Sequence, residues 1–267
     1  MMVTEFLDKL PIWGFLLASL VITFVALDSG FLLGKRSRER LTGEKKSHLG
    51  PVVAASLTLL AFMVAIVFGA VESRFNERKH IAVEEANAIG TAFLRADLLP
   101  RAYRADIRQL LYEYVTLRIE ATQIGTGQQI EQAIDRSEVI QSEMWSRAVT
   151  LAGQQPTPIS ALFVQSLNEL IDMHATRITL GIHYRMQGAI WIMLYGLAII
   201  TMIMGGYETG LSGNRRVIAI SLLAAFALSV VLTLMVALDR PWQHLSTVTQ
   251  EAMIDVQEDI RRSMQSQ

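Results

Sequence analysis

The stretch from Pro51 to Pro100 constrains the fold of this chain more than any other. No charged residue occurs between Pro51 and Val71, and a helix of that length, at about 1.5 Å per residue, crosses the hydrocarbon core of a bilayer. Charged residues follow from Glu72 onward, yet no proline occurs before Pro100. Apolar residues continue at helical spacing, and a proline disfavours helix at the residue before it. The stretch therefore predicts one helix that crosses the membrane, continues into water and ends at Pro100.

Three further apolar runs have the length of membrane spans, at Ile12–Leu33, Ala189–Tyr207 and Val217–Leu238. The 267 residues are 51% hydrophobic and 18% charged, which is too apolar for an ordinary soluble domain and too charged for a chain embedded throughout. No segment shows the alternation that is typical of strands. We predict an all-α integral membrane protein with four transmembrane helices and an inserted extramembrane helical domain.

The hydrophobic pattern divides the chain into four segments. Residues 1–73 carry the first two spans, residues 74–186 form the extramembrane helical domain, and residues 187–239 carry the last two spans. Residues 240–267 are predicted to form an amphipathic C-terminal helix. Its apolar residues recur at helical spacing, at Met253, Val256, Ile260 and Met264.

Two breaks are predicted inside the helical domain. The first is the glycine-rich triplet Gly125–Gly127. The second is Pro156–Pro158, where Thr157 suits an N-cap and the proline after it suits the first helical position. The helix that starts there is expected to cover Pro158–Arg185 and to run into the third span without a break.

Charge and motif content exclude several classes of protein. The formal net charge is −1, without the basic footprint of nucleic-acid-binding proteins. The chain contains no cysteine, which removes disulfides and thiolate metal sites. The sequence also lacks the phosphate-binding glycine loop and the common nucleophile and zinc motifs. We predict a protein that is not an enzyme, needs no cofactor and binds no nucleic acid.

A motif within the long stretch resembles a known family. It reads Glu85-Ala-Asn-Ala-Ile-Gly-Thr-Ala-Phe-Leu-Arg95, followed by Leu98-Leu-Pro100 and, after the last span, by Asp239-Arg-Pro241. These residues resemble the bacterial bestrophin-like membrane family, and the resemblance covers nearly the whole chain. It implies an ion channel in a bacterial inner membrane.

The orientation in the membrane follows from basic residues in short loops. Six of them lie between the first two spans, at Lys35, Arg36, Arg38, Arg40, Lys45 and Lys46. Short basic loops stay in the cytoplasm, so the helical domain and both termini are predicted to lie outside. The resemblance implies the opposite, because bestrophins proper carry their helical domain in the cytoplasm.

Asp28 lies inside the first span, two turns before Lys35. A carboxylate at that depth costs on the order of 2–3 kcal/mol unless it faces protein or water. One interpretation is a carboxylate that faces a pore or binds a cation. The other is a side chain that reaches the nearby interface or pairs with the basic loop.

Small or polar residues repeat along one face of the second span, at Ala54, Thr58, Ala61, Ala65, Gly69 and Glu72. Small side chains allow helices to approach closely. The same face can instead line a narrow pore that is gated where Phe62 or Phe68 turns inward. We predict that the residues from Thr58 to Glu72 on this face line a pore, with helix packing as the alternative.

A polar stripe continues beyond the span on the same long helix, at Glu84, Asn87, Thr91 and Arg95. We call these four residues the polar seam. Glu84 and Arg95 are about three turns apart, which is too far for a pair within one helix. The seam is either a vestibule that extends the pore or a set of structural hydrogen bonds with one ion pair to a neighbouring helix.

Three other residues are predicted to have structural rather than functional roles. His80 and Glu84 have a spacing that suits metal ligation, but two ligands do not make a site and no metal is predicted. His174 falls on an apolar stripe and is predicted to be a core residue with a hydrogen-bond partner. Asp239 is predicted to cap and end the last span.

The favoured function is an oligomeric channel that passes small monovalent ions through a pore lined mainly by the second span. The alternative is a non-conducting membrane scaffold or sensor whose helical domain binds partners. Glu72 and Glu84 favour cations, whereas Arg74, Arg78 and Arg95 favour anions, so the sequence leaves the sign of the ion open. The expected partners are further copies of the chain, the bilayer and small inorganic ions.

Overall fold

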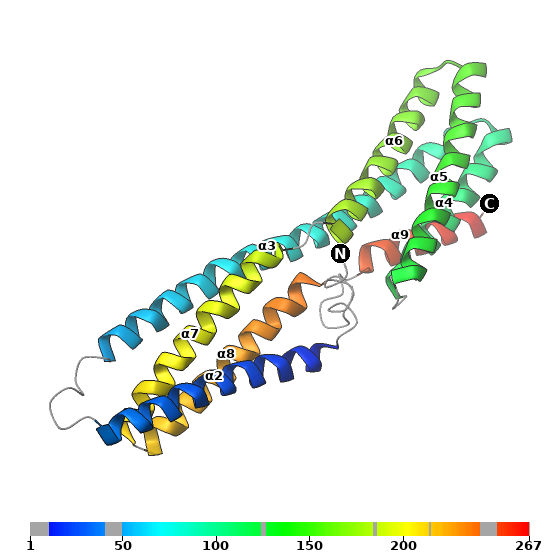
Figure 1. Cartoon of the computed structure of the whole chain (residues 1–267). Coiled ribbons are helices and arrows are strands. Elements are labelled where there is room, and N and C mark those ends of the chain that lie inside the picture. Colours follow the sequence, from blue (N-terminus) through cyan, green and yellow to red (C-terminus); the bar gives the residue numbers. More distant parts are fainter. Residues whose placement is uncertain are drawn as a thin grey trace. The chain divides into compact units, whose positions relative to one another are not determined.

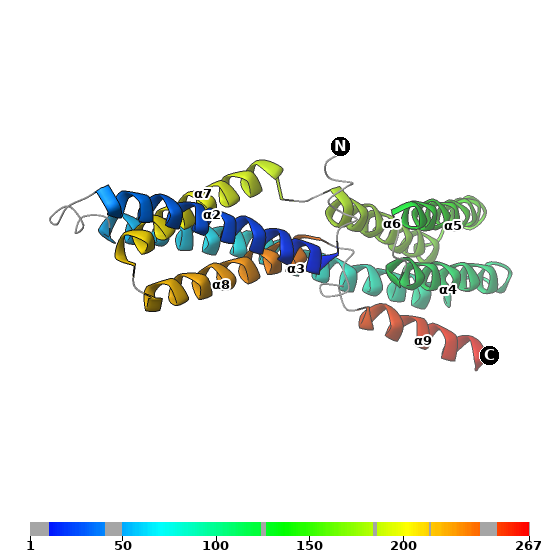
Figure 2. The same ribbon diagram turned by 60° about the horizontal axis from the view of Figure 1, so that its bottom comes forward.

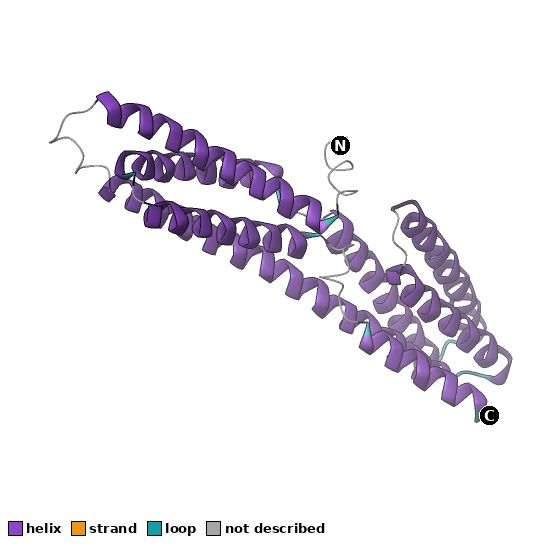
Figure 3. Ribbon diagram, turned by 90° about the horizontal axis from the view of Figure 1, so that it is seen from below, coloured by secondary structure: helices purple, strands orange, loops and turns teal. Residues whose placement is uncertain are grey.

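The computed structural model describes residues 11–40, 50–123, 127–183, 186–213, 215–240 and 250–266. Within these ranges every regular element is a helix, as Figure 3 shows, so the all-α prediction is confirmed. The chain forms two compact units. The membrane unit comprises Met1–Phe75 and Arg185–Ser246, and the helical unit comprises Asn76–Tyr184 and Thr247–Gln267.

The longest element, α3 (Gly50–Ala96), contributes residues to both units. The prediction of one helix that runs from a membrane span into the helical domain is therefore confirmed. The helix ends just before Pro100, in a short turn where the amide of Leu99 donates to the carbonyl of Ala96 at 3.1 Å.

The membrane unit is built from α2 (Ile12–Arg40), the first part of α3, α7 (Gly188–Ser212) and α8 (Arg215–Asp239) (Figure 1). Each of the four helices is long and apolar enough to cross a bilayer. The four predicted spans are confirmed, and the chain is a multi-pass membrane protein.

Helices α2 and α7 are in backbone contact within the membrane unit. A Cβ atom added to Gly206 of α7 would lie 2.0 Å from the carbonyl oxygen of Leu27, and one added to Gly30 of α2 would lie 2.0 Å from that of Ile203. Gly34 and Gly210 leave equally little room. Both helices thus carry a pair of glycines four residues apart, the spacing that brings membrane helices closest together.

The start of α7 corrects one prediction. The helix from Pro158 was expected to run unbroken into the third span, but α6 (Pro158–Ile178) passes into a π-helical turn, η2 (Thr179–His183), and α7 begins only at Gly188. Gln187 is extended, and the amide of Met186 donates to Asp239 Oδ1 at 3.2 Å. Asp239, at the end of α8, thus draws this amide away from a continuous helix.

The helical unit combines the second part of α3 with α4 (Arg101–Gln123), α5 (Gly127–Gln154), α6 and α9 (Glu251–Gln265) (Figure 2). The predicted break at Gly125–Gly127 falls mostly outside the described residues. The predicted start of α6 is confirmed, because Pro158 occupies the first turn and the hydroxyl of Thr157 accepts from the amide of Ser160 at 3.2 Å.

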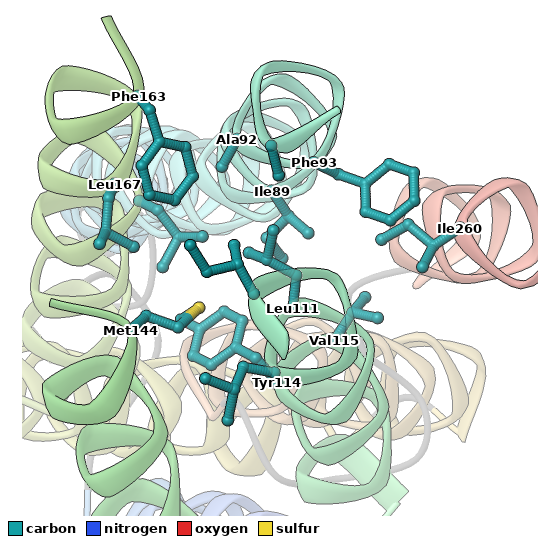
Figure 4. Packing of buried hydrophobic residues seen from close by; sticks show 14 of the residues in the cluster. Ile89, Ala92, Phe93, Leu111, Tyr114, Val115, Met144, Phe163, Leu167 and Ile260 are labelled. Atoms are coloured by element: carbon teal, nitrogen blue, oxygen red, sulfur yellow. The ribbon is translucent and has the colours of Figure 1, made fainter. Parts of the chain in front are cut away.

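The core of the helical unit draws on all five helices (Figure 4). Its fully or almost fully buried side chains include Ile89, Ala92, Phe93, Leu111, Val115, Met144, Phe163, Leu167 and Ile260. Figure 4 shows Phe93 of α3 beside Ile260 of α9. Polar contacts also attach α9 to α4, since Arg108 donates to the Ser263 hydroxyl at 2.9 Å.

Candidate functional site

The face of α3 that was predicted to line a pore is exposed along its whole length. Its residues Thr58, Ala61, Ala65, Gly69 and Glu72 are all exposed. The opposite face of the same span is buried against α7 and α8 through Leu60, Val67 and Val71. A Cβ atom added to Gly69 would meet nothing within 4 Å. The small-residue face is therefore not used for packing against the residues that the structure describes.

The two phenylalanines that were considered as gates differ in position. Phe62 is 61% exposed, on the same side of α3 as the small-residue face. Phe68 is half-buried and packs against the buried cluster of α3, α7 and α8. Of the two, only Phe62 lies where a ring can reach beyond its own chain.

Asp28 is exposed on α2 within the membrane unit. It forms no hydrogen bond or ion pair with the part of the chain that the structure describes. Pairing with the basic loop residues Lys45 and Lys46 lies outside that part. An exposed carboxylate at this depth must meet water or another protein surface.

The structure separates the members of the polar seam. Glu84 and Asn87 are exposed, whereas Thr91 and Arg95 are half-buried. Arg95 donates from Nη1 to the carbonyl of Leu162 on α6 at 2.7 Å. Glu84 lies 3.4 Å from Nδ1 of His80, one turn earlier on the same helix. The two charged ends of the seam are thus held separately within one chain.

Glu85, which follows Glu84 in the chain, lies at the centre of a buried polar cluster that sequence reasoning missed. Glu85 is completely buried. Its Oε1 accepts from the Tyr114 hydroxyl at 2.8 Å and from Arg118 Nε at 2.9 Å, and its Oε2 accepts from Arg177. Gln141 donates to the Tyr114 oxygen at 3.2 Å. The Glu85 cluster consists of Glu85, Tyr114, Arg118, Gln141, His174 and Arg177.

The Tyr114 hydroxyl fixes where the protons of this cluster lie. It has one proton, and the short contact between two oxygens requires that proton to point at Glu85. The Nδ1 atom of His174, 3.0 Å from the Tyr114 oxygen, must then be the donor in their contact. The prediction that His174 is a core residue with a partner is confirmed for Nδ1. Its Nε2 is buried without a hydrogen-bond partner in the described chain.

The charges of the cluster are mutually stabilising. Burial alone would raise the pKa of Glu85, but the guanidinium groups of Arg118 and Arg177 outweigh it and hold that pKa well below its usual value. Burial and the neighbouring Glu85 carboxylate raise the pKa of Tyr114 well above its usual value. The cluster therefore holds a carboxylate and a neutral tyrosine over the physiological pH range.

The cluster has a structural role, because it joins α3 to α4 and α6 through hydrogen-bonded ion pairs. Both oxygens of Glu85 are occupied by donors from α4 and α6, so neither is open to a substrate or a cation. A signal was present in the sequence, because Glu85 falls on the same helical stripe as Ile81, Ala92 and Ala96. A charged residue on an apolar stripe requires buried partners.

Comparison with known proteins gives a consistent fold. The chain matches the family model described as a bestrophin-like domain over residues 14–253. It is similar to the crystal structure of a membrane protein with a point mutation, at 14% sequence identity and TM-score 0.70, with 96% of this chain and 99% of that chain covered. It is also similar to a point mutant of a bacterial bestrophin homolog from Klebsiella pneumoniae, at 14% identity and TM-score 0.70, with 95% and 98% covered. No curated protein matches the chain.

Proposed function

Because the chain belongs to the bestrophin-like family, whose domain covers residues 14–253, we propose that it is an oligomeric ion channel for small monovalent ions. The pore would be lined by the first part of α3, through Thr58, Ala61, Ala65, Gly69 and Glu72. The observation that carries this proposal is that this face is fully exposed in the single chain while the opposite face of the helix is buried.

The composition of the exposed face favours contact with other copies and with water over contact with lipid. Glu72 and Thr58 are polar, and a polar side chain that faces lipid is unfavourable. A continuous row of small residues is typical of surfaces where membrane helices approach each other closely. A closed ring of identical chains places the same face of every copy around one axis. Such a ring would give each α3 a neighbour on its flanks and a water-filled path along its centre.

The polar seam extends this path beyond the membrane in our proposal. Each residue of the seam would form a ring of like groups around the axis, and such rings concentrate ions of the opposite charge. Glu84 is exposed, as a residue that meets permeating ions must be, and Arg95 is half-buried.

The second candidate is a non-conducting scaffold or sensor. It is favoured by one observation, the bond from Arg95 to the carbonyl of Leu162, which gives this arginine a structural role within the helical unit. The two candidates predict different results for variants of the seam.

We expect Glu84→Gln to lower cation permeability relative to anions, and Arg95→Gln to raise it, because each substitution removes a ring of charge. These fields are screened over about 8–10 Å at ordinary salt, so the effect requires charges at the path itself. The measurement is the reversal potential under a salt gradient in a planar bilayer. Glu138→Gln, on the exposed side of α5, is the matched control and should leave the reversal potential unchanged. Loss of stability without any shift in reversal potential, or no current from the unaltered protein, would favour the scaffold.

We expect Gly69→Leu to weaken assembly of the oligomer. The site is open within one chain, so the added side chain can only collide with a neighbouring copy. Gly69→Ala should have a smaller effect in the same direction, since it adds one methyl group. The readout is the fraction of oligomer in detergent as the protein is diluted. An unchanged oligomer in the leucine variant would mean that this face meets lipid.

A further inference from the structure

The part of α3 inside the helical unit has a buried face that combines alanines with a few large side chains. The buried residues on this part of α3 are Arg78, Ile81, Ala82, Glu85, Ala86, Ile89, Ala92, Phe93 and Ala96. Four of these nine residues are alanine, whose methyl groups interdigitate little with neighbouring helices. Close packing of large, shaped side chains is what normally fixes one arrangement. Apolar burial specifies the rotation of α3 mainly through three large side chains, those of Ile81, Ile89 and Phe93.

The contacts of Glu85 are directional, in contrast to those of the alanines. They come from both helices that pack around this carboxylate, through Tyr114 and Arg118 of α4 and through Arg177 of α6. Successive residues of a helix are about 100° apart around its axis. A rotation of α3 by one residue position would withdraw the carboxylate and leave two arginines without their anion, which is strongly unfavourable for buried charges.

We propose that Glu85 is a positioning residue that fixes the rotation of α3 relative to α4 and α6. By doing so it decides that the polar seam, rather than the alanine face, is presented to the ion path. The inference rests on the proposed function only where it concerns the ion path, because the rotation of α3 is a property of one chain. A single buried polar group can select one arrangement among several of similar packing energy.

The test uses cysteine labelling, which is clean because the natural chain has no cysteine. One cysteine is introduced at Asn87, on the exposed face, and in a second protein at Ile89, on the buried face. Full-length protein in detergent is treated with a water-soluble maleimide. We expect Asn87→Cys to react at least about tenfold faster, because a buried position reacts only after local opening. Adding Glu85→Gln should reduce this ratio by about tenfold, by slowing Asn87→Cys as well as speeding Ile89→Cys. Only a rotation slows the reaction at Asn87, because local opening speeds the reaction at the buried position alone.

Two matched controls and one conservative variant sharpen the test. Glu84→Gln removes the adjacent exposed carboxylate, and Asp106→Asn removes an ion pair with Arg147 elsewhere in the helical unit. Both should keep the labelling ratio of the unaltered chain. Arg177→Lys retains the charge but not the geometry of the guanidinium, and we expect an intermediate ratio. This variant carries the test if Glu85→Gln does not fold.

The outcomes separate this inference from the proposed function. A labelling ratio that stays unchanged in Glu85→Gln and Arg177→Lys, or that changes only through faster labelling at Ile89, would overturn the positioning role. Labelling does not depend on ion conduction. A changed ratio in a protein that passes no current would therefore support the positioning role of Glu85 and refute the proposed channel function. In a conducting protein, a changed ratio should come with a shifted reversal potential. An unshifted one would refute the link to the ion path.

Discussion

Gly206→Leu should unfold or severely destabilise the membrane unit. The first atom of the new side chain would lie 2.0 Å from the carbonyl oxygen of Leu27, and a backbone group cannot turn aside as a side chain can. Overpacking of a well-filled site costs about 1–3 kcal/mol and occasionally more, and we expect this site at or above the upper end. The measurement is thermal unfolding of the full-length protein in detergent, followed by light scattering and helical signal.

The adjacent glycine provides the control for this prediction. Gly205 has nothing within 4 Å of its added Cβ, so Gly205→Leu introduces the same side chain into the same helix without a collision. It should unfold within a few degrees of the unaltered protein. Equal melting temperatures for the two leucine variants would show that α2 and α7 are not in backbone contact.

Glu85→Ala should destabilise the helical unit by roughly 3–5 kcal/mol, the cost of leaving buried charges without their partner. The substitution leaves the guanidinium groups of Arg118 and Arg177 next to each other without an anion. Glu84→Ala, one position away and exposed, should change the stability by no more than about 0.5 kcal/mol. The free energy of unfolding from denaturant titration of the full-length protein measures both.

The deficit of Glu85→Ala should also depend on pH in a defined direction. The pKa of Glu85 is lowered in the folded chain, so the carboxylate stabilises the fold above the pKa of an unfolded glutamate, about 4.3. That contribution is lost as the pH falls through the lower folded-state pKa. The difference between the two proteins should therefore be constant from about pH 5 to pH 8 and shrink below about pH 4. A deficit that disappeared near pH 6 would contradict this assignment.

The helices could be predicted from the sequence because they depend on local patterns. The four apolar runs are long enough to have one interpretation, and the continuity of α3 follows from the absence of proline between Pro51 and Pro100. The start of α6 at Pro158 follows from a residue pair with fixed backbone preferences. The break just before α7 could not be predicted, because the amide of Met186 is held by Asp239, which lies at the end of another helix.

The candidate site could be predicted only where its residues form a repeating pattern along one helix. The small-residue face of α3 repeats at helical spacing and is visible in the sequence. The choice between Glu84 and Glu85 is not, because adjacent glutamates differ only in which side of the helix they occupy and which distant arginines meet them. Spacing alone also could not show that Gly30 of α2 lies against α7, although both helices carry glycines four residues apart.

The helical unit is discontinuous along the chain, and this has a consequence for biosynthesis. Its last element, α9, follows α7 and α8 in the sequence, so two membrane crossings are synthesised between Tyr184 and the residues that complete the core. Until then the sites that Met253 and Ile260 will fill remain open to water. Exposed apolar surface on a nascent chain promotes aggregation. The helical unit can therefore reach its final packing only after α7, α8 and α9 have all been synthesised.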